Sequence, residues 1–347
     1  RGTGLPRGSV GRPDTPSLRG MSEHTPAAPA SLGPAHRKVG VVGAGGVGTA
    51  ICYAALIRGV AREVALYDID EPKARAEVLD LAHGTPFTSA SAMTGGADPD
   101  VLAGCEVGVI TAGAKQRPGQ TRLDLGAHNV EILRGLLPQV QAHAPDALIV
   151  LVTNPVDVLT LVAQRLTGLP AGRVIGSGTL LDTSRLRWLL ASRAQVHASS
   201  VHAAILGEHG DTEFPAWSSA RIGPTPILEW PTPAAPLFTR ADLDEVADTV
   251  VHAAYEVIRG KGATTYAVGV ATTRLLEAIL RDQHAILPVS TVLDGVHGLS
   301  DVALSMPSVV GRDGVTRVIQ PELDAAEMRA LHSSADALRR EARSLGF

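Results

Sequence analysis

Short apolar runs alternate with helical patterns through the first half of the chain. The runs are almost continuous in Val, Ile, Leu and Ala, which is typical of strands buried on both faces of a parallel sheet. Four of them are expected to be strands, namely residues 38–42, 63–67, 107–111 and 147–152. Strand, helix, strand repetition requires right-handed crossovers. The pattern therefore predicts an α/β fold, with a doubly wound parallel sheet over residues 37–177.

The pattern changes after Asp182. The remaining elements are a helical stretch to Arg193, a Gly- and His-rich segment near residue 209, a Pro-rich connection over 224–236, helices from about 241, strand-like pieces at 286–293 and 301–310, and a charged helix over about 324–345. This mixture predicts a second domain of the α+β class over residues 178–347.

Residues 1–36 are rich in Pro, Gly, Ser and Arg and contain no apolar run, so they are expected to be a disordered leader or a tag-like extension. The net charge of -4 gives no reason to expect nucleic acid as a partner. The uncharged stretch 41–57 is interrupted by four glycines and is short for a bilayer span, so no membrane helix is expected.

Two cysteines, Cys52 and Cys105, are too few for a disulfide framework, and both lie in apolar segments. Both are therefore expected to be buried free thiols of a protein in the reducing cytoplasm. No metal site is expected.

A glycine-rich turn follows the first predicted strand. Gly43, Gly45 and Gly48 fit G-x-G-x-x-G, in which the glycines permit a tight turn, close approach of a pyrophosphate and close helix–sheet packing. Asp68 ends the next strand, where a carboxylate would accept hydrogen bonds from ribose hydroxyls and would repel a 2′-phosphate. The first half is therefore predicted to be a Rossmann domain that binds NAD through this turn, Val47 and Asp68.

Three side chains further along could serve oxidation of a 2-hydroxy acid. Such a reaction needs a proton acceptor and a cation for the carboxylate. His209 lies in GEHGD and can exchange a proton near neutral pH. Asp182 and Arg185 stand three residues apart on a predicted helix, so both can face one cleft, with Asp182 holding the imidazole and Arg185 the carboxylate. A structural histidine and an ordinary surface ion pair remain the alternatives at this point.

Six segments extend the pattern. They are GAGGVG, TAGAKQRPGQTRLDL, VTNPVDV, GSGTLLDTSRLR, ILGEHGDTEF and KGATTYAVG, in this order. Through them, residues 38–345 resemble the lactate and malate dehydrogenase family, especially its bacterial L-lactate dehydrogenases. The resemblance implies the last step of fermentative glycolysis, with pyruvate and L-lactate as substrates.

The resemblance also implies individual roles. His209 would be the acid/base, Asp182 its orienting partner and Arg185 the carboxylate clamp. It further implies that Arg122 polarises the substrate carbonyl from a mobile loop, and that Asn154 and Thr264 contact the reacting region, with Asn154 also touching the cofactor.

Substrate choice in this family depends on the residue preceding K/R-P-G of the loop, which here is Gln116. A neutral glutamine would leave the second carboxylate of oxaloacetate unpaired, so pyruvate is expected. Arg117 could replace Gln116 after a one-residue shift in register, which keeps malate dehydrogenase as the alternative. A non-catalytic NAD-binding sensor is the alternative of another class.

Arg187 lies two residues after Arg185, about 200° around the helix, and therefore cannot serve the same cleft. The resemblance implies that Arg187 and His202 line a fructose 1,6-bisphosphate site at a subunit interface. It also implies a homotetramer. Activation by this bisphosphate is thus expected, with ordinary interface contacts as the alternative.

Overall fold

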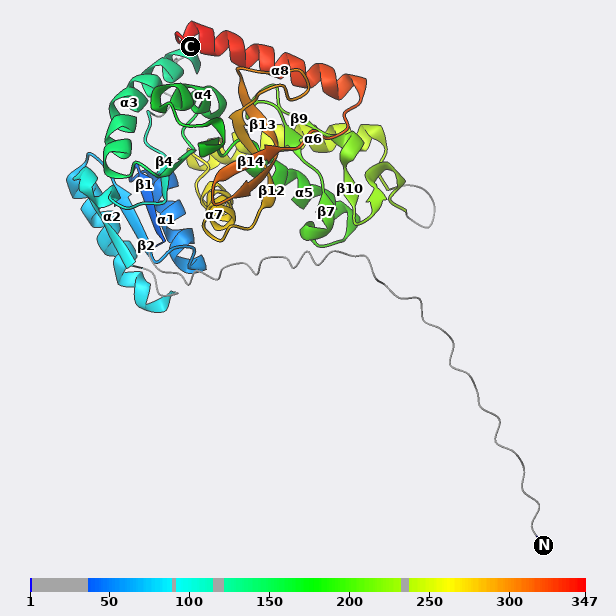
Figure 1. Ribbon diagram of the computed structural model, residues 1–347. Coiled ribbons are helices and arrows are strands. Elements are labelled where there is room, and N and C mark those ends of the chain that lie inside the picture. Colours follow the sequence, from blue (N-terminus) through cyan, green and yellow to red (C-terminus); the bar gives the residue numbers. More distant parts are fainter. Residues whose placement is uncertain (2–36, 89–91, 115–121, 232–236) are drawn as a thin grey trace. The chain divides into compact units, whose positions relative to one another are not determined.

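A computed structural model describes residues 37–88, 92–114, 122–231 and 237–347, together with Arg1 and apart from the side chains of Arg122 and Ala254 (Figure 1). The predicted leader therefore lies, except for Arg1, outside the described residues. Pro34–Phe347 form one compact unit.

A nine-stranded sheet organises this unit, in the order β14-β13-β12-β6-β5-β4-β1-β2-β3. Its strands are β1 (Lys38–Val42), β2 (Glu63–Tyr67), β3 (Ala92–Gly96), β4 (Val107–Ile110), β5 (Leu148–Leu151), β6 (Val174–Gly176), β12 (Ala285–Val292), β13 (Ala303–Gly311) and β14 (Gly314–Val318). The first six pair in parallel, whereas β12, β13 and β14 are antiparallel. The doubly wound parallel core predicted from the sequence is confirmed.

Helices cover both faces of the sheet. The α-helices are α1 (Gly46–Arg58), α2 (Glu71–Gly84), α3 (Arg122–His143), α4 (Val156–Thr167), α5 (Leu180–Ala194), α6 (Arg240–Lys261), α7 (Tyr266–Leu280) and α8 (Ala325–Ser344). Short 3₁₀ helices are η1 (Thr85–Phe87), η2 (Pro99–Leu102), η3 (Ala171–Arg173), η4 (Ala198–Ser200), η5 (Trp217–Ser219) and η6 (Ile227–Glu229). Two small sheets complete the fold, one of β7 (Val201–His202), β10 (Arg221–Ile222) and β11 (Thr225–Pro226), the other of β8 (Ile205–Leu206) and β9 (Phe214–Pro215).

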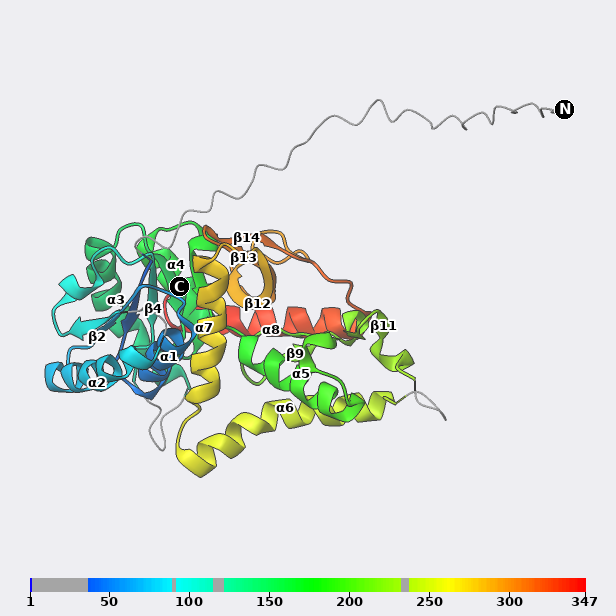
Figure 2. The same cartoon turned by 90° about the horizontal axis from the view of Figure 1, so that it is seen from below.

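Burial on both sheet faces explains the apolar runs of the sequence. Every residue of β4 and β5 is buried, because α1 lies against one face of the parallel core and α3 and α4 pack on the other. Figure 2 shows α7 beside α1 and α5 beside α6, and both helix pairs are in contact. Two separate layers of apolar side chains thus hold the sheet between them.

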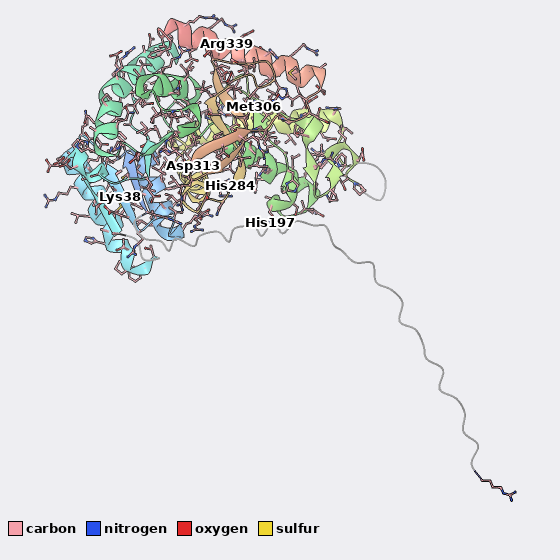
Figure 3. The ribbon with its side chains drawn as sticks, in the orientation of Figure 1. Lys38, His197, His284, Met306, Asp313 and Arg339 are labelled. Carbon is pink, nitrogen blue, oxygen red and sulfur yellow. The ribbon has the colours of Figure 1, made fainter. Side chains whose placement is uncertain are left out.

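Polar contacts fix the edges of this packing. Lys38, at the start of β1, pairs with Glu63 of β2 at 2.9 Å (Figure 3). Arg339 of α8 donates a 2.7 Å hydrogen bond to the carbonyl of Ser300, which ties α8 to the loop before β13 (Figure 3). Asp324 caps α8 in a capping box with Glu327, so the predicted start of this helix is confirmed.

The strands of the second half, β12 to β14, continue the first sheet, through the pairing of Ser290 with Gly176. The predicted domain boundary between residues 177 and 178 falls between β6 and α5.

No helix in the described part of the chain is long and apolar enough to cross a membrane. Cys52 and Cys105 are both free and buried. Burial raises the pKa of the Cys105 thiol to about 12, so this thiol is not a reactive nucleophile at neutral pH.

Candidate active site

The glycine turn lies at the carboxyl end of β1, where the strand order reverses between β1 and β4. Gly43 has a φ of +108°, and a Cβ there would lie 2.7 Å from the backbone nitrogen of Ala112. A Cβ on Gly48 would lie 1.9 Å from the carbonyl oxygen of Gly43. By contrast, nothing lies within 4 Å of a Cβ built on Gly45. The first and third glycines therefore permit the packing, and the second leaves open space in front of the helix.

That space suits an anionic group. Gly45 is the N-cap of α1 and has no side chain to cap the first-turn N–H groups, and the first turn contains no acidic residue. Helix N-termini of this kind bind phosphate through free N–H groups and the helix dipole. Val47 is partly buried in this first turn. The residues present thus fit the pyrophosphate of a dinucleotide.

Asp68 lies beside the turn, as the sequence predicted. Its Oδ2 accepts a 2.6 Å hydrogen bond from the backbone N–H of Ala44, and its Oδ1 accepts one of 3.0 Å from that of Asp70. Asp70 itself caps α2 by accepting from the N–H of Lys73. The turn and the acid are therefore joined directly, and of the two acids only Asp68 contacts the glycine turn.

A pocket of about 230 Å³ lies further along the same edge of the sheet. His209, Asp182, Arg185 and Asn154 all line it. His209 follows β8, whereas Asp182 and Arg185 lie on the first two turns of α5. Residues 27 positions apart in the sequence are thus brought into one cluster.

Asp182 holds both cations of this cluster. The Nδ1–H of His209 donates to its Oδ2 at 2.6 Å, and Nη1 of Arg185 donates to its Oδ1 at 2.5 Å. The Asp182 side chain is 3% exposed and that of His209 is 29% exposed. The imidazole therefore turns one nitrogen to the carboxylate and leaves Nε2 for a ligand.

This arrangement shifts the proton affinity of the pair. Burial alone would lower the pKa of His209, but the charge of Asp182 and its hydrogen bond outweigh burial and raise the pKa to about 9. Burial would raise the pKa of Asp182, yet the charges of His209 and Arg185 hold it below its usual range. His209 is thus kept as an imidazolium around neutral pH in the absence of ligands.

Two buried side chains that the sequence analysis did not single out fix the backbone around the cluster. Asp157, on the first turn of α4, is 2% exposed and accepts a 2.7 Å hydrogen bond from the backbone N–H of His209. Asn129 of α3 is 1% exposed. It donates to the carbonyl of Asn154 and accepts from the N–H of Ala114, both at 2.8 Å. No local pattern signals such contacts, since each links segments that only the fold brings together.

Other predicted residues lie elsewhere. Among the described residues, Thr264 does not line the pocket but lies in the turn between α6 and α7, next to Thr265, which faces Gly46. Arg122 is the first residue of α3, and its side chain lies outside the described part. Gln116 and Arg117 also lie outside the described residues.

The two residues predicted to bind a bisphosphate are neighbours in the fold. His202 is exposed in β7. Nε of Arg187 donates a 2.8 Å hydrogen bond to the carbonyl of Ala203, the residue after His202. Burial lowers the pKa of Arg187. Arg187 thus lies away from the cluster of Arg185 and Asp182, as the helix geometry predicted.

Among the residues that the structure describes, one group in the pocket has metal-ligand chemistry. Asp182, His209 and Glu213 each offer an atom within 4.8 Å of the others. The guanidinium of Arg185 contacts Asp182 at 2.5 Å and would repel a cation there. The expectation that no metal is needed stays a prediction.

Comparisons with known proteins cover nearly all of the described unit. Residues 37–176 match the family model described as lactate/malate dehydrogenase, NAD binding domain, and residues 179–345 match that described as lactate/malate dehydrogenase, alpha/beta C-terminal domain.

Relatives at full length agree. An L-lactate dehydrogenase of Bifidobacterium animalis subsp. lactis is 45% identical over 311 residues, which are 89% of this chain and 97% of that protein. One of Synechococcus sp. (strain JA-3-3Ab) is 47% identical over 87% of this chain and 97% of its own length. The crystal structure of the minor L-lactate dehydrogenase of Enterococcus mundtii is 40% identical, with a TM-score of 0.85 over 89% of this chain and 98% of that one.

Proposed function

Because this chain belongs to the lactate/malate dehydrogenase family, we propose that it is an NAD-dependent L-lactate dehydrogenase. It interconverts L-lactate and pyruvate. The observation that carries the proposal is the buried Asp182 that holds His209 and Arg185 side by side in one pocket. The relatives named as L-lactate dehydrogenases support the choice of substrate.

His209 is the proton-exchanging residue. In L-lactate oxidation, its Nε2 accepts the hydroxyl proton while the hydride on C2 leaves. Bound NAD supplies the hydride acceptor through its nicotinamide ring. In the reverse direction the imidazolium returns the proton to the carbonyl oxygen of pyruvate. The contact of Nδ1 with Asp182 keeps the ring oriented through both steps.

Arg185 binds the substrate carboxylate. Asp182 holds one of its terminal nitrogens, at Nη1, and a carboxylate needs two parallel N–H groups of the guanidinium fork. The side chain is 16% exposed, so an ion pair with the substrate would be shielded from water. Asp182 contacts both Arg185 and His209. A carboxylate bound by Arg185 therefore places C2 of the substrate beside the imidazole of His209.

The cofactor binds along the glycine turn, with Gly43, Gly45, Val47 and Gly48 facing the pyrophosphate and Asp68 the adenosine ribose. Asn154 contacts both the cofactor and the substrate. It lines the pocket, and its backbone carbonyl accepts a hydrogen bond from Asn129.

Three roles rest on the family alone. Arg122 would polarise the carbonyl on closure of the loop, and Thr264 would contact the reacting region. Gln116 would select pyruvate over oxaloacetate.

Assembly and regulation complete the proposal. We expect a homotetramer in the cytoplasm, activated by fructose 1,6-bisphosphate at Arg187 and His202. Exposed apolar side chains support association of copies, because they line one groove between α1 and α7: Tyr53, Ile57, Tyr266 and Val270. The neighbouring positions of Arg187 and His202 support a shared anion site.

The test is NADH oxidation by the purified protein with pyruvate and with oxaloacetate, each with and without fructose 1,6-bisphosphate. We expect a strong preference for pyruvate, and a lower half-saturation value with the bisphosphate. Preference for oxaloacetate would make the chain a malate dehydrogenase in which Arg117 reads the substrate. Absence of turnover with both would favour a non-catalytic NAD-binding protein.

A further inference from the structure

The pocket contains carboxyl groups for which the proposed reaction has no use, and one of them, that of Glu213, lies close to His209 and Asp182. Glu213 lies four residues after His209, lines the same pocket and is partly buried. Its carboxyl group, the imidazole of His209 and the carboxylate of Asp182 offer atoms that lie within 4.8 Å of one another. A glutamate at this distance acts directly on any charge in the pocket.

The charges of the cluster can be counted in its two states. Asp182 is matched by Arg185, and a protonated His209 adds one positive charge. With Glu213 neutral, the cluster carries one positive charge, which a substrate carboxylate cancels. With Glu213 ionised, these four side chains are together neutral, and the same carboxylate then adds a negative charge to a pocket that Glu208, Asp211 and Glu341 also line. Ionised Glu213 and the substrate carboxylate therefore oppose each other.

The neutral form of Glu213 is the favoured one at pH 7. Burial, followed by the charge of Asp182, raises its pKa to about 8, although His209, Arg185 and the backbone amide of Gly210 act in the opposite sense. Other titratable groups face this pocket, namely Glu208 and Asp211 of the same loop, Tyr255 of α6 and Glu341 of α8. Asp157, which accepts a hydrogen bond from the backbone N–H of His209, is a further carboxyl group near the cluster.

We propose that Glu213 is a proton-linked determinant of substrate binding, which admits a carboxylate to Arg185 only while it is itself protonated. This inference rests on the proposed function and names a residue that adjusts it. Binding of pyruvate, or of any small monocarboxylate, then takes up a proton at Glu213 whenever the free enzyme has lost it. Ionisation of Glu213 lowers carboxylate affinity without removing the acid/base His209.

Two measurements on the full chain test this. The first is the KM for pyruvate between pH 6.5 and 9.5. The second is proton uptake when the non-reducible pyruvate isostere oxamate binds to the NADH complex, measured by calorimetry in two buffers of different ionisation enthalpy. At pH 8 about half of Glu213 is ionised in the free protein.

The variant that decides is Glu213→Gln, which is neutral at every pH. For the wild type we expect the KM to rise towards tenfold per pH unit above about pH 8. The variant should show a smaller rise over the same range, and its proton uptake at pH 8 should be smaller by up to about half a proton. The matched control is Glu131→Gln, because the side chain of Glu131 is 73% exposed on α3 and does not line this pocket. It should behave as the wild type.

The outcomes are distinguishable. Equal pH dependence and equal proton uptake in wild type and Glu213→Gln would overturn the role of Glu213 while leaving pyruvate turnover, and hence the proposed function, intact. Failure of the wild type to turn over pyruvate would instead overturn the function. Should Glu213→Gln fold poorly, Glu213→Met repeats the test, with NADH affinity as the measure of an intact cofactor site.

Discussion

Replacing Asp182 by asparagine tests the electrostatic core of the site. The change keeps the size of the side chain and an acceptor for Nδ1–H of His209, but removes the negative charge. In the native site the pKa of His209 is raised from 6.5 to about 9 against the effect of burial, mainly by this contact, at 2.6 Å, and further by the charges of Asp157 and Glu213. That difference corresponds to roughly 3 kcal/mol of stabilisation of the imidazolium.

The consequence is calculable for pyruvate reduction, which needs the protonated imidazole. In Asp182→Asn, burial without the carboxylate should bring the pKa of His209 to 6.5 or below. Through the loss of protonation alone, kcat/KM should fall only several-fold at pH 7 but on the order of 100-fold at pH 9. The decline that His209 causes lies near pH 9 in the wild type, beyond the one that Glu213 causes above about pH 8, and it should move to below pH 7. Stopped-flow and steady-state oxidation of NADH between pH 5.5 and 9.5 would measure both.

A matched control exists on α6. His252 and Asp248 form another histidine–aspartate contact, at 3.2 Å, but both side chains are more than half exposed, at 65% and 73%. Asp248→Asn should leave the pH profile unchanged, because exposed pairs contribute little. The reasoning about Asp182 is refuted if Asp182→Asn loses activity but its kcat/KM begins to decline no earlier than that of the wild type, since the carboxylate would then not set the proton affinity of His209.

Three further changes address other parts of the molecule. Arg185→Leu should raise the KM for pyruvate at least about 100-fold through loss of two charged hydrogen bonds, while NADH binding, followed by fluorescence quenching, stays as in the wild type; weakened NADH binding would argue against a substrate role. Asp68→Ala should raise the KM for NADH and narrow its advantage over NADPH, and an unchanged ratio of the two rates would contradict the ribose contact. Arg58→Ala should lower the free energy of unfolding by about 2 kcal/mol, because the buried Glu277 would lose a bidentate partner. Urea denaturation measures this change. Glu277 also pairs with Arg281 at 3.5 Å, and an undiminished midpoint would mean that this second pair suffices.

Those elements that local patterns specify could be predicted from the sequence. Strands β1 and β2 have their predicted bounds, because continuous apolar runs are buried on both faces. Helix α1 begins at Gly46, inside the predicted glycine-rich turn, so the turn itself supplies the first turn of the helix. Strands β3 and β6 escaped prediction: β3 carries two glycines and an exposed edge, and β6 is only three residues long.

The residues of the site likewise divide into those that local sequence patterns predict and those that they do not. Asp182 and Arg185 could be predicted to share a cleft because helix periodicity determines their directions, and the contact of Asp182 with His209 agreed with the chemistry that the reaction needs. The positions of Asn129 and Asp157 could not be predicted, since their partners come from other strands and loops. Long-range contacts of this kind have no counterpart in local sequence spacing. The roles of Gln116, Arg122 and Thr264 stay predictions.

The continuous sheet has a consequence for recombination between relatives. The boundary near residue 177 looks like a natural crossover point for chimaeras, since it separates the two matched family regions. Yet β12 pairs with β6 across that boundary, and a Cβ on Gly178 would lie 2.3 Å from Oγ of Ser305 in β13. A chimaera joined there would have to recreate a strand pairing and a close-packed seam from two lineages, whereas an exchange of the exposed segment around α6 would leave the sheet intact.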